Sequence, residues 1–174
     1  PMAAYDFGAE VTSPFTQRHC WDLHAADRHV VDMALEGPDL EVQGTLWGGN
    51  LALVAHLVGS PYLPPVKDGV LFLEDIGESP YRIERLLLQL HFCGVLGAQR
   101  AIVLGSFNGY EPGPNDGGHD LAAVVAQLRS RIDVPVYTGL PFGHVREKLT
   151  LPVGGQARLV VRDGRAQLAL SGYA

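Results

Sequence analysis

Apolar residues in the middle of the chain alternate between continuous runs and helical stripes. Residues 70–73 and 101–104 are uninterrupted apolar runs, which are typical of strands buried on both faces of a parallel sheet. Between these runs, Ser79-Pro80 is a helix start signal. The helix that follows carries apolar residues on one face, at Ile83, Leu86, Leu87 and Leu90. The pattern predicts two parallel strands joined by a right-handed helical crossover.

A further helix and a third strand extend this pattern. Asp120 is a suitable N-cap for a helix that continues to residue 132, with apolar residues on one face. Residues 134–137 then form a short apolar strand. Three strands that alternate with helices predict an α/β domain with a parallel central sheet.

The two ends of the chain follow a different pattern, in which apolar and polar residues alternate. Residues 30–35 and 40–46 are separated by the turn residues Gly37-Pro38-Asp39 and are expected to pair as a β-hairpin. Three more strands are expected near the C-terminal end, at residues 148–153, 157–161 and 167–170. We therefore expect antiparallel strands to flank the parallel centre.

Two shorter helices are expected before the first apolar run. Ser13-Pro14 begins one that ends near Ala26, and Gly48-Gly49-Asn50 begins another over residues 51–58. The two glycines lack the lysine and the spacing of nucleotide-binding loops, so we expect them to let the helix begin close to the sheet. Asn50 is expected to hydrogen-bond to nearby backbone. We find no internal repeat, no low-complexity segment and no linker that would divide the chain.

Composition excludes several classes of protein. The 174 residues are 47% hydrophobic and 18% charged, which fits one compact domain and not a disordered chain. The net charge of −6 and the scattered Lys and Arg residues offer no basic surface for nucleic acid. No apolar run approaches the ~20 residues of a membrane span, and the first residues lack the features of a signal peptide. We therefore expect a cytoplasmic protein that does not bind a membrane.

Metal and disulfide chemistry are not indicated by the sequence. Cys20 and Cys93 lie far apart without CxxC spacing, and both are expected to pack within helices. His19, His24 and His29 recur every five residues. Because five residues turn a helix by about 500°, these side chains would not share one helix face. We expect no zinc site, and a solvated or partly packed histidine surface instead.

Candidate catalytic side chains follow two of the expected parallel strands. Glu74 and Asp75 come directly after residues 70–73, and His144 lies in the loop after the third strand. Because ligands bind at the carboxyl ends of parallel strands, Glu74 and His144 are expected to lie at the same edge of the sheet. The carboxylate would orient the imidazole, and the imidazole would accept a proton from a nucleophile. The residues also fit a second interpretation, in which the acid caps a helix and the loop histidine is incidental.

The residues alone do not identify the nucleophile, and they leave two roles open for the acids beside Glu74. Asp75 and Glu78 would either contact a cationic group of a substrate or cap the next helix, and acids in a first helical turn favour the caps. Ser106 follows an apolar strand, but a loop comes after it, whereas a nucleophile elbow needs a following helix. No serine or cysteine is therefore an evident nucleophile for His144.

Five motifs resemble those of one known family. They are Gly44-Thr45-Leu46-Trp47-Gly48-Gly49-Asn50-Leu51, Leu73-Glu74-Asp75-Ile76 with Glu78, Tyr81-Arg82-Ile83-Glu84-Arg85, Leu104-Gly105-Ser106-Phe107 and Thr138-Gly139-Leu140-Pro141-Phe142-Gly143-His144. In order and spacing they closely resemble the serine LD-carboxypeptidases, which are the muramoyltetrapeptide carboxypeptidases of bacteria. The resemblance runs from end to end of the chain.

The resemblance implies the C-terminal half of such an enzyme. Residues 28–174 would form a three-layer ββα domain of the swivelling type, with a parallel sheet, helices and an antiparallel sheet. Residues 1–27 would connect this domain to an N-terminal domain and form a short helix. The N-terminal domain would precede Pro1 and supply the nucleophilic serine.

The resemblance also assigns roles to individual residues. Glu74 and His144 match the glutamate and histidine of the family's Ser-His-Glu triad. Asn50, Trp47 and Asp75 are expected to bind substrate or to support the site. No metal and no other cofactor is implied.

The implied reaction removes the terminal D-alanine from murein tetrapeptides during peptidoglycan recycling, through an acyl-enzyme. The expected partners are the serine-bearing domain, the murein peptide and a second copy in a homodimer, and the chain alone is expected to be inactive. Two alternatives stay open. One is a relative of the microcin C immunity peptidase, which cleaves acyl-sulfamoyl or peptidyl adenylates, and the other is a binding or assembly module without the reaction.

Overall fold

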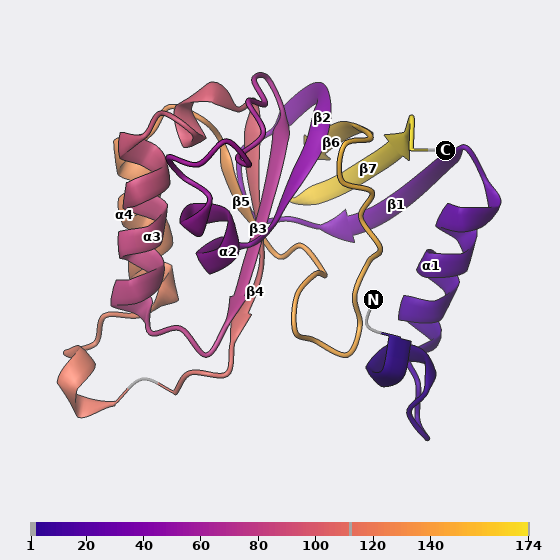
Figure 1. The fold of residues 1–174 in the computed structure, drawn as a ribbon, viewed down its shortest axis with the longest axis horizontal. Helices are drawn as coiled ribbons and strands as arrows, with labels where there is room; N and C mark the ends of the chain where they lie inside the picture. Colours follow the sequence, from indigo (N-terminus) through magenta and orange to yellow (C-terminus); the bar gives the residue numbers. More distant parts are fainter. Residues whose placement is uncertain (1–2, 112, 174) are drawn as a thin grey trace.

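The centre of the fold is one mixed β-sheet of seven strands, in the order β1-β7-β6-β2-β3-β4-β5 (Figure 1). The computed structural model describes residues 3–111 and 113–173. The strands are β1 (Arg28–Ala34), β2 (Leu40–Asn50), β3 (Val70–Ile76), β4 (Ala101–Asn108), β5 (Val136–Thr138), β6 (Gln156–Arg162) and β7 (Arg165–Ser171). The α/β class with both parallel and antiparallel strands is confirmed.

The parallel half of the sheet follows the pattern of the central apolar runs. β2, β3, β4 and β5 pair in parallel, and the first six residues of β3 are all buried. Three helices cover one face of this half, namely α2 (Leu51–His56), α3 (Pro80–Phe92) and α4 (Leu121–Arg131). Short 3-10 turns lie at η2 (Leu96–Ala98) and η3 (Pro114–Asp116). Asp120 caps α4 by accepting from the Ala123 amide, as expected.

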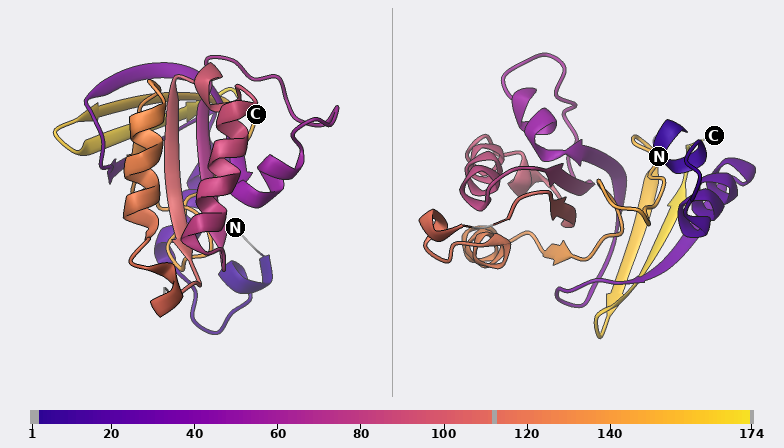
Figure 2. Two further views of the ribbon diagram at one scale, coloured as in Figure 1. Left: turned by 90° about the vertical axis from the view of Figure 1, so that its left-hand side faces the viewer. Right: turned by 90° about the horizontal axis from the view of Figure 1, so that it is seen from below.

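The antiparallel half covers the opposite face of the parallel half. It consists of β1, β7, β6 and the first half of β2, so β2 belongs to both halves. Apolar residues of β6 and β7 and those of β3 and β4 form one shared core. Figure 2 shows the antiparallel strands at a steep angle to the parallel ones. The helices α2, α3 and α4 lie on the opposite face of the parallel strands. The result is the expected ββα arrangement of three layers.

Two predictions about the antiparallel strands are wrong. β1 and β2 do not form a hairpin, because the β6–β7 hairpin lies between them and pairs with both. The connection between β1 and β2 crosses at the Asp163-Gly164 turn, where the Leu35 amide donates to the Gly164 carbonyl. The antiparallel strands also lie on one side of the parallel strands and do not flank them. Alternating residues define a buried face but not the partner strand.

The strand expected at residues 148–153 is absent, because these residues belong to the loop between β5 and β6. The backbone donors at its start are used elsewhere. The Lys148 amide donates to the Thr16 hydroxyl, and the Leu149 amide donates to the Pro141 carbonyl. Buried donors need a partner, and here the loop and the N-terminal helix supply it.

The two glycines that were expected to begin α2 lie in the sheet instead. Gly48 and Gly49 belong to β2 and pair with Phe72 and Leu73 of β3. Gly48 has a φ of +135°, and a Cβ atom at this position would collide with the Phe72 carbonyl oxygen. Gly48 therefore permits a close approach of β2 to β3, whereas a Cβ atom at Gly49 would meet nothing within 4 Å. Helix α2 begins only at Leu51.

The N-terminal segment, residues 3–25, contains η1 (Ala3–Phe7) and α1 (Pro14–Ala25). Ser13 caps α1, as expected, by accepting from the Thr16 amide. None of the described helices of the protein is long and apolar enough to cross a membrane. The expected packing of the cysteines holds for Cys20, which is buried, but Cys93 is exposed at the end of α3.

The expected solvated or partly packed histidine surface fits His24 but not His19 and His29. His19 on α1 and His29 on β1 are buried, and their ring nitrogens Nδ1 and Nε2 lie 2.9 Å apart. Helical spacing did not apply to this pair, because the chain turns from helix to strand between the two residues. His24 is exposed and bonds the Cys20 carbonyl through Nδ1.

We predict that this pair makes stability depend on pH. Burial lowers the pKa of His19 and of His29 below 6.5, Arg18 lowers both further, and Asp22 acts in the opposite direction. Below about pH 6.5 the unfolded chain therefore binds more protons than the folded one, and the free energy of unfolding falls as the pH falls. From about pH 7.5 to 5.5 the wild type should therefore lose more of its free energy of unfolding than the double variant H19Q/H29Q.

Urea unfolding at the two pH values measures this difference. His24→Gln is the matched control, because His24 lies on the same helix but is exposed. This variant should keep the pH dependence of the wild type. Equal pH dependence of the wild type and H19Q/H29Q would show that the buried pair does not titrate as expected.

Candidate functional site

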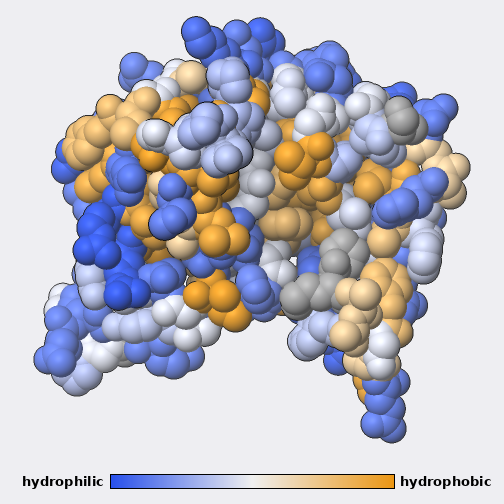
Figure 3. Space-filling view, viewed as in Figure 1, coloured by the Kyte–Doolittle hydropathy of each residue, from blue (hydrophilic) through white to orange (hydrophobic). Residues whose placement is uncertain are grey.

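The candidate site lies where the parallel strands end. In Figure 1 the carboxyl ends of β3 and β4 point to the lower edge of the molecule, and the loop after β5 returns beside them. The space-filling view in the same orientation shows this edge hollowed between two projecting parts (Figure 3). One projection surrounds η3 and the other is the N-terminal segment.

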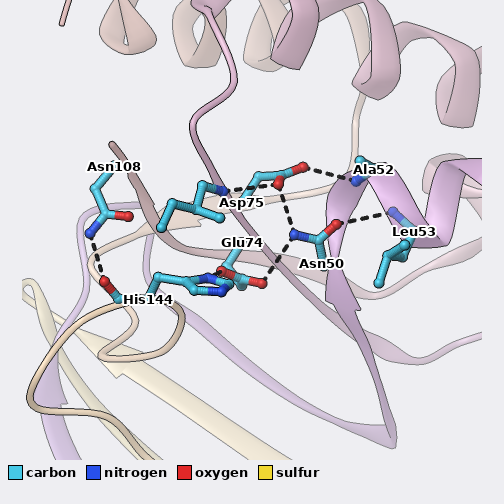
Figure 4. A network of polar contacts seen from close by, with 8 residues as sticks. Asn50, Ala52, Leu53, Glu74, Asp75, Asn108 and His144 are labelled. Carbon is cyan, nitrogen blue, oxygen red and sulfur yellow. Dashed lines mark hydrogen bonds and ion pairs between the residues drawn. The ribbon is translucent and has the colours of Figure 1, made fainter. Parts of the chain in front are cut away.

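Glu74 and His144 form a hydrogen-bonded pair at this edge (Figure 4). The His144 Nδ1 atom lies 3.0 Å from Glu74 Oε2. The Glu74 side chain is 6% exposed, whereas the His144 side chain is 38% exposed. The sequence expectation that both residues meet at one edge of the sheet is therefore confirmed, although 70 positions separate them.

Asn50 connects Glu74 to the neighbouring Asp75 (Figure 4). Its Nδ2 donates to Asp75 Oδ1 at 2.7 Å and to Glu74 Oε1 at 3.4 Å. Its Oδ1 accepts from the Leu53 amide at 3.1 Å and so caps α2. Both ends of the Asn50 amide are thus held, and the orientation of the buried Glu74 carboxylate is held with them.

Asp75 caps a helix, but not the helix that follows it. Its Oδ2 accepts from the Ala52 amide in the first turn of α2 at 2.9 Å, and its Oδ1 accepts from its own neighbour Ile76. The sequence favoured a cap on the next helix, α3, because only chain order was available. The parallel pairing of β2 with β3 places the start of α2 beside the end of β3 instead.

The loop that carries His144 is bound to the end of β4. The Ser106 amide donates to the Phe142 carbonyl at 2.8 Å, and Asn108 Nδ2 donates to the His144 carbonyl at 2.8 Å. Gly143 has a φ of +120°. Asn108 was missed by sequence reasoning, and its only signal is its position at the end of an apolar strand.

The structure places Trp47 outside this network. Its indole is 4% exposed and belongs to the core beneath the helices, where Nε1 donates to Gln99 Oε1 at 2.8 Å. Glu78 forms a surface ion pair with Arg82 at 3.3 Å. Ser106 lies inside β4, which continues to Asn108 without a helix directly behind it, so it lacks the setting of a nucleophile elbow.

A second carboxylate–imidazole pair, between Glu84 and His119, was not anticipated. His119 Nε2 lies 3.0 Å from Glu84 Oε2, and the side chains are 33% and 22% exposed. Glu84 lies on α3 and not at a strand end. Within residues 3–111 and 113–173, no group of three or more His, Cys, Asp or Glu side chains could hold a metal ion.

The geometry of His144 suits the transfer of a proton at Nε2. An ionised Glu74 accepts a hydrogen bond and therefore holds the proton of the neutral ring on Nδ1. Nε2 then carries the lone pair, and it makes no hydrogen bond to any described part of the chain. An acid that orients a partly exposed imidazole in this way is the arrangement of a general base.

The fold and this pair together define a mixed α/β domain with a carboxylate-oriented histidine at the carboxyl ends of its parallel strands. Residues 43–159 match the family model described as the LD-carboxypeptidase C-terminal domain. The chain therefore belongs to the LD-carboxypeptidase family. The family resemblance seen in the sequence motifs is confirmed.

The known proteins that are similar to this chain are longer than the part that it matches. The muramoyltetrapeptide carboxypeptidase from Oxalobacter formigenes superposes with a TM-score of 0.95 at 45% identity, and the match covers 100% of this chain and 61% of that one. The murein tetrapeptide carboxypeptidase of Pseudomonas aeruginosa is 34% identical over 79% of this chain and 44% of its own length. The microcin C7 self immunity protein, solved with aspartyl sulfamoyl adenosine, gives a TM-score of 0.67 at 25% identity. That match covers 81% of this chain and 41% of the immunity protein.

Proposed function

We propose that this chain supplies the acid–base pair of a serine LD-carboxypeptidase that releases the terminal D-alanine from murein tetrapeptides. The observation that carries the proposal is the bond between Glu74 and His144 at 3.0 Å, with a buried carboxylate and a partly exposed ring. In this proposal Glu74 orients His144, and His144 moves protons at Nε2. Asn50 and Asp75 hold Glu74 in place.

The proposed reaction is acyl transfer without a metal. His144 Nε2 takes the proton of a serine hydroxyl as the oxygen attacks the carbonyl carbon of the bond before D-alanine. The imidazolium then protonates the leaving amine, so that D-alanine departs and an acyl-enzyme remains. Water attacks this ester with His144 again as base, and the serine regains its proton. Glu74 stabilises the imidazolium at both stages.

The serine is proposed to lie outside these residues, in another part of the protein. The chain spans 61% of the Oxalobacter formigenes carboxypeptidase and 44% of the Pseudomonas aeruginosa relative, which leaves room for a serine-bearing domain. The open Nε2 of His144 supports the same proposal. Such a domain would complete the hollow edge with its nucleophile and oxyanion hole.

The proposed substrate is a murein tetrapeptide, met in the cytoplasm during peptidoglycan recycling. The names of the relatives from Oxalobacter formigenes and Pseudomonas aeruginosa support this choice. The likeness to the microcin C7 self immunity protein is weaker, with a TM-score of 0.67 against 0.95. An acyl-sulfamoyl adenylate is therefore the alternative substrate to be tested.

A side-by-side assay with the full-length protein tests the proposal. Murein tetrapeptide and aspartyl sulfamoyl adenosine are incubated separately, and the products are identified by mass spectrometry. We expect release of D-alanine from the tetrapeptide and little cleavage of the adenosine compound. Residues 1–174 alone should release no D-alanine. Preferential cleavage of the adenosine compound would overturn the murein assignment, and no cleavage of either would favour a binding module.

A further inference from the structure

The position of His144 depends on how its loop is held. No regular helix or strand occurs between Thr138 at the end of β5 and Gln156 at the start of β6. Before and at His144, the loop is bound to β4 through the Phe142 and His144 carbonyls, as described above. After His144, the Leu149 amide donates to the Pro141 carbonyl at 2.8 Å and closes the loop on itself. Residues 145–148 lie between these points, and other contacts must hold them if the ring is to stay at Glu74.

The residues after His144 are held by one hydroxyl group of the N-terminal segment. Thr16 lies on α1 and is 0% exposed. Its Oγ1 donates to the Arg146 carbonyl at 2.9 Å and accepts from the Lys148 amide at 3.0 Å. A single side chain thereby satisfies two backbone groups of the loop, on residues two and four positions beyond His144.

A buried ion pair holds the same part of the loop. Lys148 Nζ lies 3.0 Å from Asp6 Oδ1, and the two side chains are 5% and 2% exposed. The ammonium group also lies 5.0 Å from the centre of the Tyr5 ring, where a cation is attracted to the aromatic face. Because an unpaired charge is costly to bury, this contact resists separation of the loop from η1.

We propose that Thr16 and the Asp6–Lys148 pair are positioning residues for His144. The N-terminal segment then acts on the site through the loop that carries His144. The inference rests on the proposed role of His144 as a base. Loss of the Thr16 hydroxyl would release Arg146 and Lys148, and a shift of about 1 Å at His144 would weaken its bond to Glu74.

Thr16→Val in the full-length protein is the direct test. Valine keeps the branched shape but lacks the hydroxyl group. We expect kcat for D-alanine release to fall by roughly 10-fold with KM within about twofold, because the ring and not the substrate is displaced. Thr16→Ser, which keeps the hydroxyl, should restore kcat.

The tautomer of His144 gives a readout that a merely structural role would not change. The ring 15N shifts of histidine-labelled protein, assigned by the signal lost in His144→Gln, distinguish Nδ1–H from Nε2–H at a pH where the ring is neutral. We expect Nδ1–H in the wild type and in Thr16→Ser, and a shift toward Nε2–H in Thr16→Val. This measurement does not depend on substrate, so it decides the inference even if murein tetrapeptide is not hydrolysed.

Tyr173→Phe is the matched control. The Tyr173 hydroxyl donates to the Ala26 carbonyl at the other end of α1, at 2.8 Å. Its loss removes one hydroxyl that holds the same helix at Ala26 and not at Arg146 or Lys148, so kcat and the tautomer should stay as in the wild type. A folded Thr16→Val protein with wild-type kcat and tautomer would overturn the inference, as would equal changes in Tyr173→Phe.

A second variant covers the case in which Thr16→Val does not fold. The double variant D6N/K148M removes both charges of this ion pair together. It should shift the His144 tautomer in the same direction as Thr16→Val. A wild-type tautomer in this variant would overturn the part of the inference that concerns the ion pair and, if Thr16→Val is unfolded, the inference as a whole.

Discussion

Replacing Glu74 by glutamine in the full-length protein is expected to lower kcat for D-alanine release by roughly 10³- to 10⁴-fold. Glutamine keeps the size of the side chain, but a neutral amide replaces the carboxylate oxygen that lies 3.0 Å from His144 Nδ1. The amide would neither stabilise a positive imidazolium nor hold the proton on Nδ1. Steady-state kinetics with murein tetrapeptide measure the loss, and KM should change far less than kcat.

His144→Gln is expected to cause a loss of at least the same size, because it removes the atom that accepts the proton. The double variant E74Q/H144Q should be no worse than H144Q, since residues that act as a unit lose their effect together. A double variant much slower than either single variant would mean that the two residues act separately. Circular dichroism should show that all three proteins are folded.

The Glu84–His119 pair provides a matched control for this prediction. It has the same two residue types at the same separation of 3.0 Å, but Glu84 lies on α3 and not at a strand end. Glu84→Gln and His119→Gln should keep kcat within about twofold. If Glu74→Gln and His144→Gln also left kcat within a few-fold of normal, the proposed catalytic pair would be disproved.

Gly143→Ala is expected to lower kcat by at least roughly 100-fold while the protein stays folded. A Cβ atom at Gly143 would lie 2.9 Å from Glu74 Oε2, the oxygen that bonds to His144, and 3.2 Å from Glu74 Cβ. Glu74 is buried between the loop and the sheet, so its carboxylate would have to rotate away from the imidazole. The substitution therefore acts on the pair without removing either of its members.

Gly154→Ala separates this contact from backbone strain. Gly154 lies in the same loop with a φ of +91°, compared with +120° for Gly143, but a Cβ atom there would meet nothing within 4 Å. Both variants should lose stability, on the order of 1 kcal/mol, from the strained backbone. Only Gly143→Ala should lose activity, as measured by kcat and by thermal melting of both proteins. Equal activity in the two variants would contradict the prediction.

The parallel part of the fold could be predicted because its signals are local. The apolar runs of β3 and β4 and the stripe of α3 are each complete within a few residues, and a helix between two strands fixes parallel pairing. Pairing in the antiparallel part depends on contacts between β1 and β7 and between β2 and β6, which are far apart in the sequence. A strand shows the same alternation of apolar and polar residues whichever strand it pairs with. The expected β1–β2 hairpin was therefore as consistent with the sequence as the observed strand order.

The candidate site also has residues that could be predicted from the sequence and residues that could not. Glu74 and His144 could be named in advance because Glu74 lies near the carboxyl end of β3 and His144 follows β5, and parallel strands end at one edge. The residues that hold this pair in place could not be named in advance. Asn50 reaches both carboxylates only because β2 runs beside β3, and Asp75 caps α2 for the same reason. Trp47 has a family motif around it, but its indole faces the helical core.

The sequence by itself determined the βαβ centre, the family and the two residues of the proposed acid–base pair, because these depend on local periodicity and on the order of short motifs. Only the tertiary structure decided that the β6–β7 hairpin separates β1 from β2, and that His19 meets His29. It also decided that Thr16 holds the His144 loop across 130 positions of sequence. Contacts of this kind arise when the sheet closes its core, and no neighbouring residue records which distant partner will satisfy a buried polar group.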